Sequence, residues 1–247
     1  MKNFLISFFI GRAAAHADKN KKTDMQKISD HLNKKTKEPW TWVFYGDSIT
    51  HGACHTRGYR SFVEIFHEYL RWELRFKEDS VINSGSSGYS TFELLNEDYY
   101  NFMVRRYKPQ VVFLLIGCND IVLPECGGAE GFRLRLEKLV KRIQQDGSIV
   151  VLQTYNTMRN VKEPEDYAER YVQFPAFNQV IRDTAEKYNT ILIDHCKYWE
   201  ENADLETWLD EPLHPGAPGH LEMAKLILES LNADITKSPA CQININR

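Results

Sequence analysis

The sequence lacks the features that mark several classes of protein. Its 31 lysine and arginine residues nearly balance 34 aspartate and glutamate residues, and a net charge of −3 offers no basic stripe for nucleic acid. The 5 cysteines are odd in number and form no Cys-x-x-Cys pair, which argues against a disulfide framework or a zinc site. No segment approaches the ~20 apolar residues of a membrane-spanning helix. We therefore predict no nucleic-acid partner, no metal ion and no membrane span.

What the sequence contains is typical of a folded protein. Apolar residues make up 43% and charged residues 26% of the 247 residues, close to the average for globular domains. A chain of this length buries a full core without disulfides or metals. We find no internal repeat and no low-complexity stretch. We predict one domain over residues 39–235, with a helical N-terminal extension over residues 1–38 and a loose tail over residues 236–247.

The N-terminal extension allows two interpretations. Lys2 precedes a short apolar run over residues 4–10, and Ala-His-Ala at residues 15–17 resembles a signal-peptide cleavage site. The run is at the lower limit of a signal peptide's apolar region, however. The alternative is an amphipathic helix that continues to Ile28 and Leu32. We favour the helix and a cytoplasmic location, with a signal peptide and a secreted or periplasmic protein as the alternative.

Short apolar runs alternate with segments that carry apolar residues at helical spacing. Predicted strands cover residues 41–45, 81–82, 111–116, 148–152 and 190–194. Predicted helices cover residues 61–76, 92–107, 132–145, 175–188 and 222–231. This alternation predicts an α/β fold in which helices cover both faces of one parallel sheet. Active sites of such sheets lie beyond the carboxyl ends of the strands. Residues 155–174 form a long connection without a clear pattern of its own, and we expect it to border that edge.

Polar motifs follow the predicted strands at this edge. Gly-Asp-Ser-Ile-Thr occupies residues 46–50, Asn-Ser-Gly-Ser-Ser-Gly residues 83–88 and Gly-Cys-Asn-Asp residues 117–120. Asp-Glu-Pro-Leu-His-Pro at residues 210–215 precedes the last helix. Each motif alone is weak evidence, because glycine, asparagine and aspartate are common in turns. Their order along the chain is what points to one shared site.

Ser48 and His214 are the candidate nucleophile and general base. A serine hydroxyl is a weak nucleophile until a base takes its proton. A carboxylate shortly before His214 can bind the other ring nitrogen and stabilise the imidazolium. Two carboxylates qualify, because Glu211 lies three residues before the histidine and Asp210 lies four before it. Acyl transfer also needs donors for the developing oxyanion.

Three groups can supply those donors. Gly88 offers a backbone N–H, Asn119 offers a side-chain amide, and the backbone N–H of Ser48 is a third donor. All three follow neighbouring strands, so we expect them to converge on one point.

These motifs resemble those of the SGNH hydrolases, also called GDSL esterases and lipases. The resemblance runs from about residue 42 to residue 231. It implies a flavodoxin-like five-stranded sheet and a serine nucleophile at Ser48. It also implies oxyanion donors at Gly88 and Asn119, a base at His214, and no cofactor. The family has Asp-x-x-His in the last motif, whereas this chain has Glu211 at the aspartate position. We favour Glu211 as the acid over Asp210.

The resemblance predicts a serine esterase that acts on a small or short-acyl ester. Residues 52–62 look like those of bacterial members thought to act on small esters or acetylated sugars, so an O-acetyl group on a carbohydrate is one possible substrate. The alternatives are a thioesterase or a lysophospholipase with the same site, or a non-catalytic carbohydrate-binding descendant of the fold. Pocket shape separates the first two, and catalytic residues do not.

Several further residues are candidates for contact with substrate or metal. We place His55 in the cleft near the nucleophile, and Tyr155 and Asn156 on its border. The alternative is that the aromatic residues of that long connection only pack it down. His51, Cys54 and His55 have metal-binding side chains, but they lie on one loop without a metal-binding motif, and we predict no metal there.

Four other residues receive structural roles. We expect Cys118 to be a small buried side chain. Asp47 and Asp120 should hold their loops through hydrogen bonds to backbone N–H groups. His220 lies in the last predicted helix, where we expect it to face solvent or to cap.

Overall fold

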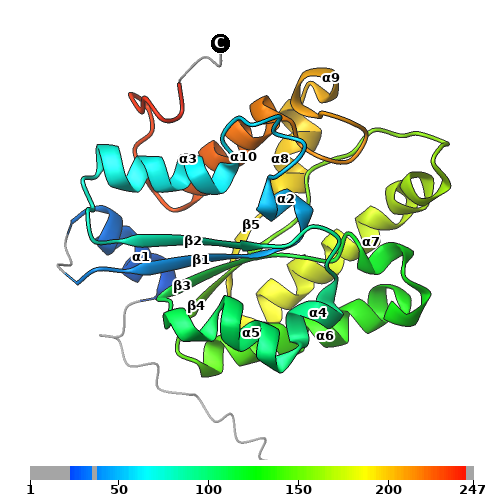
Figure 1. Cartoon of the computed structure of the whole chain (residues 1–247), viewed down its shortest axis with the longest axis horizontal. Helices are drawn as coiled ribbons and strands as arrows, with labels where there is room; N and C mark the ends of the chain where they lie inside the picture. Colours follow the sequence, from blue (N-terminus) through cyan, green and yellow to red (C-terminus); the bar gives the residue numbers. More distant parts are fainter. Residues whose placement is uncertain (1–22, 35–37, 243–247) are drawn as a thin grey trace, which may run out of the picture.

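The computed structural model describes residues 23–34 and 38–242. A parallel sheet with strand order β2-β1-β3-β4-β5 forms its centre (Figure 1). This is the order of flavodoxin-like folds, so the predicted fold class is confirmed. The strands are β1 (Thr41–Gly46), β2 (Ser80–Gly85), β3 (Val111–Leu115), β4 (Ile149–Gln153) and β5 (Ile191–Ile193).

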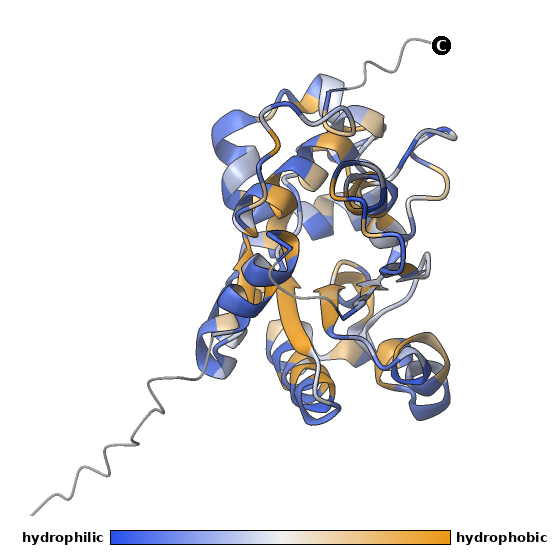
Figure 2. Cartoon of the chain, turned by 90° about the vertical axis from the view of Figure 1, so that its left-hand side faces the viewer, coloured by the Kyte–Doolittle hydropathy of each residue, from blue (hydrophilic) through white to orange (hydrophobic). Residues whose placement is uncertain are grey.

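Helices cover both faces of the sheet and complete a three-layer sandwich (Figure 1). One layer contains α3 (Phe62–Glu68), α8 (His195–Asn202) and α10 (Ala217–Ser230). The other contains α4 (Thr91–Leu95), α5 (Glu97–Met103), α6 (Gly128–Gln145) and α7 (Glu165–Tyr188). Figure 2 shows the apolar residues concentrated on the strands between these layers. Within the described ranges, we find no helix with the length and apolar character needed to cross a membrane.

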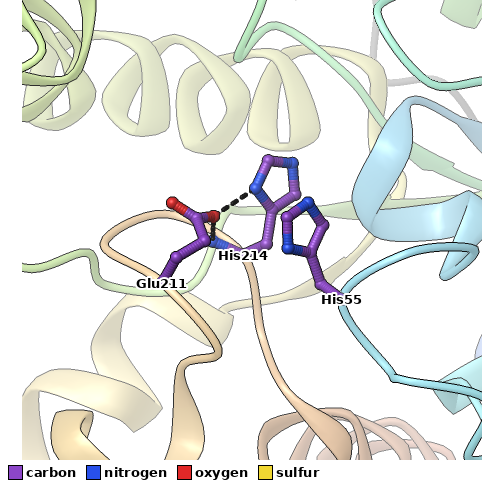
Figure 3. Close-up of side chains that lie close together, drawn as sticks. All are labelled: His55, Glu211 and His214. Carbon is purple, nitrogen blue, oxygen red and sulfur yellow. Dashed lines mark hydrogen bonds and ion pairs between the residues drawn. The ribbon is translucent and has the colours of Figure 1, made fainter.

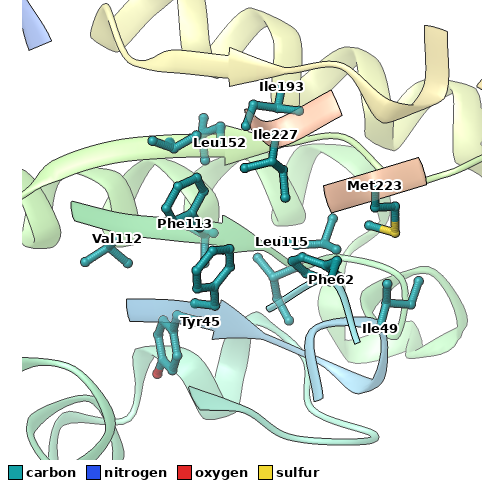
Figure 4. Close-up of a cluster of buried hydrophobic side chains, with 14 of the residues drawn as sticks. Tyr45, Ile49, Phe62, Val112, Phe113, Leu115, Leu152, Ile193, Met223 and Ile227 are labelled. Atoms are coloured by element: carbon teal, nitrogen blue, oxygen red, sulfur yellow. The ribbon is translucent and has the colours of Figure 1, made fainter. Parts of the chain in front are cut away.

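Alternate residues of the central strands enter opposite layers, as the period of two in a strand requires. Phe44 stacks on Phe113, with ring centroids 4.2 Å apart, on the face covered by α3. Tyr45 points the other way and donates a hydrogen bond to the carbonyl of Leu94 in α4. Figure 4 shows Phe113 and Val112 on opposite sides of β3. Every residue of β3 is buried, which explains its continuous apolar sequence.

Two predicted helices are shorter than expected. The helix predicted over residues 61–76 is α3 followed by a π-helical turn, Tyr69–Glu73. The helix predicted over residues 92–107 is divided at Asn96, whose ψ of 129° is extended and whose side chain caps the N-terminus of α5. Helical periodicity runs across this break because α4 and α5 bury apolar residues on the same side of the sheet.

The long connection predicted over residues 155–174 is partly wrong. Helix α7 begins at Glu165 and runs through Pro175, whereas the sequence predicts a helix that starts at Pro175 and covers residues 175–188. Two acidic residues in its first turn favour a helix start there. The helix therefore carries Arg170 to the residues that follow β3, where its Nε donates to the carbonyl of Cys118.

Residues on both sides of the predicted domain pack against it. Helix α1 (Asp24–Leu32) begins at a capping box and buries Ile28 and Leu32 in the core. The predicted tail is not loose over its described part, because Ser238 donates a hydrogen bond of 2.6 Å to Glu73 and Cys241 is buried. The proposed signal-like run and cleavage site, within residues 1–22, lie outside the described residues.

Candidate active site

The end of β1 places Ser48 at the first position of a one-turn helix, α2 (Ser48–His51). Asp47 caps this helix by accepting a hydrogen bond of 3.0 Å from a backbone N–H. The turn is tight, and a Cβ atom on Gly46 would lie 2.3 Å from the carbonyl oxygen of Leu115. The close approach of β1 and β3 therefore requires glycine two residues before the serine.

Ser48, His214 and Glu211 form a continuous hydrogen-bonded chain. The Oγ atom of Ser48 lies 2.8 Å from Nε2 of His214. On the opposite edge of the ring, Nδ1 of His214 is hydrogen-bonded to Oε1 of Glu211 (Figure 3). Burial raises the pKa of Glu211, but hydrogen bonds from the side chain and backbone of His214 outweigh it and lower this pKa to about 2. Glu211 is therefore a carboxylate at neutral pH, and it accepts the Nδ1 proton of the ring.

Asp210 has a different partner. Its carboxylate accepts a hydrogen bond of 3.2 Å from Nδ1 of His55 and one of 2.5 Å from Nε of Arg57. Of the two acids that the sequence left open, the structure places only Glu211 against His214. The extra methylene of glutamate does not prevent the contact, since the carboxylate also accepts the backbone N–H of His214 at 2.7 Å.

Gly88 lies in a loop that is attached on one side to the motif that follows β1 and on the other to the motif that follows β3. Before it, the N–H of Ser86 donates to the carbonyl of Gly46 at 2.9 Å. After it, the carbonyl of Tyr89 accepts a hydrogen bond of 2.9 Å from Nδ2 of Asn119. Gly88 itself has a φ of 82°, a conformation that favours glycine. These contacts bring the ends of β1, β2 and β3 together at one place, as predicted.

The amide of Asn119 is held by a residue that the sequence analysis missed. Nη2 of Arg170 donates to Oδ1 of Asn119 at 3.3 Å, and Nε donates to the carbonyl of Cys118 at 3.3 Å. Arg170 is 7% exposed. The guanidinium of Arg170 donates to the oxygen of the amide. The NH₂ group of Asn119 therefore points away from Arg170. The sequence carried no signal for this contact, because Arg170 lies in the segment predicted as a loop.

Tyr155 has a structural position, which corrects the prediction that it contacts substrate. Its side chain is fully buried, and its hydroxyl donates to Oδ2 of Asp47. The same hydroxyl accepts a hydrogen bond of 2.8 Å from the backbone N–H of Cys118. Tyr155 thus connects the motif that follows β1 to the motif that follows β3. Burial raises the pKa of Asp47 from 3.8 to about 6, although the Tyr155 hydroxyl opposes the rise.

Asn156 also lies behind the site, and we correct its predicted role in the same way. It is 1% exposed, and its Nδ2 donates a hydrogen bond of 3.1 Å to the carbonyl of Leu213, the residue before His214. Tyr167, on the first turn of α7, lies near Glu211 and helps to lower the pKa of that carboxyl. Burial and this carboxylate raise the pKa of Tyr167 to about 12. Both residues therefore support the loop that carries Glu211 and His214.

His220 is buried, which corrects the prediction that it faces solvent or caps. Its Nδ1 accepts a hydrogen bond of 3.3 Å from the backbone N–H of Phe62, and burial lowers its pKa to about 3. It is a neutral contact between α3 and α10.

The roles of Asp120 and Cys118 agree with the predictions. Asp120 is fully buried and accepts a hydrogen bond of 3.0 Å from the N–H of Thr91. Cys118 is 3% exposed, and burial raises the pKa of its thiol to about 12. Cys118 therefore remains a protonated thiol beside Asn119.

The side chains that could bind a metal ion do not group along the loop over residues 51–55. Among the described residues, the three possible metal ligands that lie within 4.8 Å of one another are His55, Glu211 and His214. The planes of the two imidazoles are 6° apart and stacked. An ion bound to an imidazole nitrogen lies near the ring plane, so these rings as stacked do not share one ion. The prediction of a metal-free site stays a prediction.

Comparisons with known proteins identify relatives of this chain. A family model described as the GDSL-like Lipase/Acylhydrolase family matches residues 44–221, which is more than half of the chain. A multidomain esterase of Ruminococcus flavefaciens is 25% identical over 240 residues, covering 80% of this chain and 29% of that protein. The chain thus spans under a third of the length of the curated relatives it matches.

Solved structures show the same fold. The lipase/acylhydrolase of Enterococcus faecalis is 25% identical with a TM-score of 0.65, covering 78% of this chain and 95% of that one. The acetylxylan esterase Axe2 of Geobacillus stearothermophilus is 21% identical with a TM-score of 0.63, covering 81% and 97%.

Proposed function

Because the chain belongs to the GDSL-like lipase/acylhydrolase family, we propose that it is a carboxylic ester hydrolase with Ser48 as its nucleophile. The observation that carries the proposal is the 2.8 Å contact between Oγ of Ser48 and Nε2 of His214. Because Nδ1 of His214 bears the proton that Glu211 accepts, Nε2 has a lone pair with which to take the hydroxyl proton.

In the first half of the reaction, Ser48 attacks the ester carbonyl while its proton passes to Nε2 of His214. The imidazolium that forms is stabilised by the carboxylate of Glu211. The carbonyl oxygen becomes an oxyanion, which the N–H groups of Ser48 and Gly88 and the amide of Asn119 are proposed to bind. The imidazolium then protonates the leaving alcohol, and an acyl group remains on Ser48.

In the second half, water replaces the alcohol. His214 removes a proton from that water as it attacks the acyl carbonyl, and the same donors bind the second oxyanion. Collapse of this intermediate releases the acid and returns the proton to Ser48. Over the whole cycle, His214 passes the proton of Ser48 to the alcohol and returns a proton from water to Ser48.

We propose that the substrate is a small or short-acyl ester, with an O-acetyl group on a carbohydrate as the leading class. Two observations support a polar alcohol portion. Polar residues lie beside His214, which contacts Ser48: His55 stacks on its ring, and the backbone N–H of Asp210 donates to its carbonyl at 3.0 Å. Acetylxylan esterases are also among the proteins of similar fold.

The first test is hydrolysis of p-nitrophenyl acetate together with labelling by a fluorophosphonate probe. We expect the wild-type chain to hydrolyse the ester and to be labelled on Ser48. Ser48→Ala should lose both, with kcat lower by about 10⁴-fold or more. A wild-type chain that is neither active nor labelled would instead favour a non-catalytic role.

The second test compares p-nitrophenyl esters of increasing chain length with acetylated xylo-oligosaccharides, an acyl thioester and a lysophospholipid. We expect kcat/KM to fall as the acyl chain lengthens. Preference for the thioester or the lysophospholipid would replace the proposed substrate class while leaving the assignment of Ser48 intact.

A further inference from the structure

A second histidine–carboxylate pair lies directly against the first. The rings of His55 and His214 are parallel, 6° apart, with centroids separated by 3.9 Å (Figure 3). Each ring is hydrogen-bonded through Nδ1 to one of two adjacent acids, His214 to Glu211 and His55 to Asp210. The proposed acid–base mechanism uses only the first pair.

This second pair joins two segments that are far apart in the sequence. His55 and Arg57 belong to the turns that follow the nucleophile helix α2, whereas Asp210 belongs to the loop that carries His214. Asp210 binds both residues of the turn, at 3.2 Å and 2.5 Å. The side chain of Arg57 is 75% exposed, so its ion pair alone contributes little. The stacked side chains of His55 and His214 are 29% and 14% exposed, so the stack is the better shielded part of the connection.

The position of His214 shows why such a contact matters. It lies on the loop between α9 (Leu205–Trp208) and α10, where a bridge between Leu209 and Pro215 and a hydrogen bond of 3.0 Å from the N–H of Asp210 to the carbonyl of His214 hold the backbone. These contacts hold the backbone but do not touch the face of the ring. The hydrogen bonds from its two ring nitrogens to Ser48 and Glu211 lie near the ring plane. They do not prevent the ring from rotating about the line that joins the two nitrogens. A flat side chain packed against the ring face opposes that rotation. Catalysis depends on this orientation, since a misplacement of about 1 Å costs about 10²-fold in rate.

We propose that His55 is a positioning residue that holds the ring of His214 in its catalytic orientation by stacking on it, while Asp210 fixes His55. This inference rests on the proposed esterase function. It assigns Asp210 a role that is separate from that of the catalytic acid.

Two variants separate the stack from the hydrogen bond. His55→Phe keeps a flat ring and loses the bond to Asp210, whereas His55→Gln keeps a donor and loses the ring. With p-nitrophenyl acetate, we expect His55→Gln to lower kcat by about 10- to 100-fold with little change in KM. His55→Phe should stay within about threefold of the wild type, because the stacked contact remains. Cys54→Ala, an exposed neighbour on the same turn, is the matched control and should match the wild type.

A spectroscopic readout tests the same inference without turnover. The proton shared by Nδ1 of His214 and Glu211 should give a far-downfield proton NMR resonance, as expected of a charge-assisted hydrogen bond. We expect this resonance to persist in His55→Phe and to broaden or disappear in His55→Gln.

Three results would overturn the inference: wild-type behaviour of both variants, an equal loss in both, or a loss confined to His55→Phe. A wild-type chain without hydrolytic activity would contradict the proposed function instead. The NMR comparison would still decide whether His55 positions the ring.

Discussion

Nη2 of Arg170 lies 3.3 Å from the side-chain oxygen of Asn119, so helix α7 decides which end of that amide is available to an oxyanion. The carbonyl of Tyr89 takes one amide proton at 2.9 Å. With the oxygen and one N–H engaged, the remaining N–H is the one that the amide can offer to a substrate. Four predictions follow from this contact and from the others around the site.

Arg170→Met should lower kcat, because the amide of Asn119 loses the cation that orients it. We expect a decrease of about 10-fold, less than for removal of an oxyanion donor itself. KM should change little, since the effect is largest in the transition state. Steady-state kinetics on p-nitrophenyl acetate measure both constants. Arg133→Met, an ion-paired arginine on α6, is the control and should keep wild-type kinetics. A change in KM alone would make Arg170 a substrate-binding residue.

Asn119→Ala should lower kcat by about 10²–10³, the usual cost of removing one oxyanion donor. The same assay applies, and circular dichroism should show an unchanged fold. Because Arg170 acts through Asn119, adding Arg170→Met to Asn119→Ala should cause little further loss of kcat. Fully additive losses would show that Arg170 acts by another route.

Glu211→Gln should reduce kcat strongly, because an amide can hold the wrong tautomer of His214. Asp210→Asn should have the smaller effect, since that carboxylate binds His55 and Arg57 instead. Glu211→Asp is expected to retain part of the activity through a shorter side chain at the same position. All three variants are compared by kcat on one short ester. A severe Asp210→Asn with a mild Glu211→Gln would reverse the assignment of the acid.

Tyr155→Phe should destabilise the protein more at alkaline than at acidic pH. Burial raises the pKa of Asp47 from 3.8 to about 6, so the folded state loses stability as pH rises through that window. The hydrogen bond from the Tyr155 hydroxyl lowers the pKa of Asp47, so in Tyr155→Phe this pKa should rise above 6. The variant should then lose stability over a wider range of pH than the wild type. We therefore expect a loss of about 1–3 kcal/mol at about pH 8, and a smaller loss at about pH 5.

Thermal unfolding of wild type and variant at the two pH values measures this difference. Tyr171→Phe, which changes an exposed tyrosine within α7, serves as the control. An equal loss of stability at both pH values would mean that the Tyr155 hydroxyl does not stabilise the ionised form of Asp47.

Local pattern was enough to predict the sheet and the edge at which the site lies. The apolar run of β3 has the composition of a strand covered on both faces, and the motifs that follow β1, β2 and β3 lie together because parallel strands end at one edge. Helix α7 shows the limit of this reasoning. Its first half has no clear helical period, and Pro175 indicated a start where the folded chain continues a helix.

The sequence by itself determined the five strands and their alternation with helices, and it located Ser48, Gly88, Asn119 and His214 on one edge of the sheet. Spacing alone could not choose between Glu211 and Asp210, because both can reach a histidine three or four residues away. Only the tertiary structure decided this, by bringing His55 from a distant segment to occupy Asp210. The same is true of Arg170 and Tyr155, whose partners lie 51 and 108 residues away in the chain. Hydrogen bonds between such distant residues depend on how the layers pack, and no local pattern of residues encodes that packing.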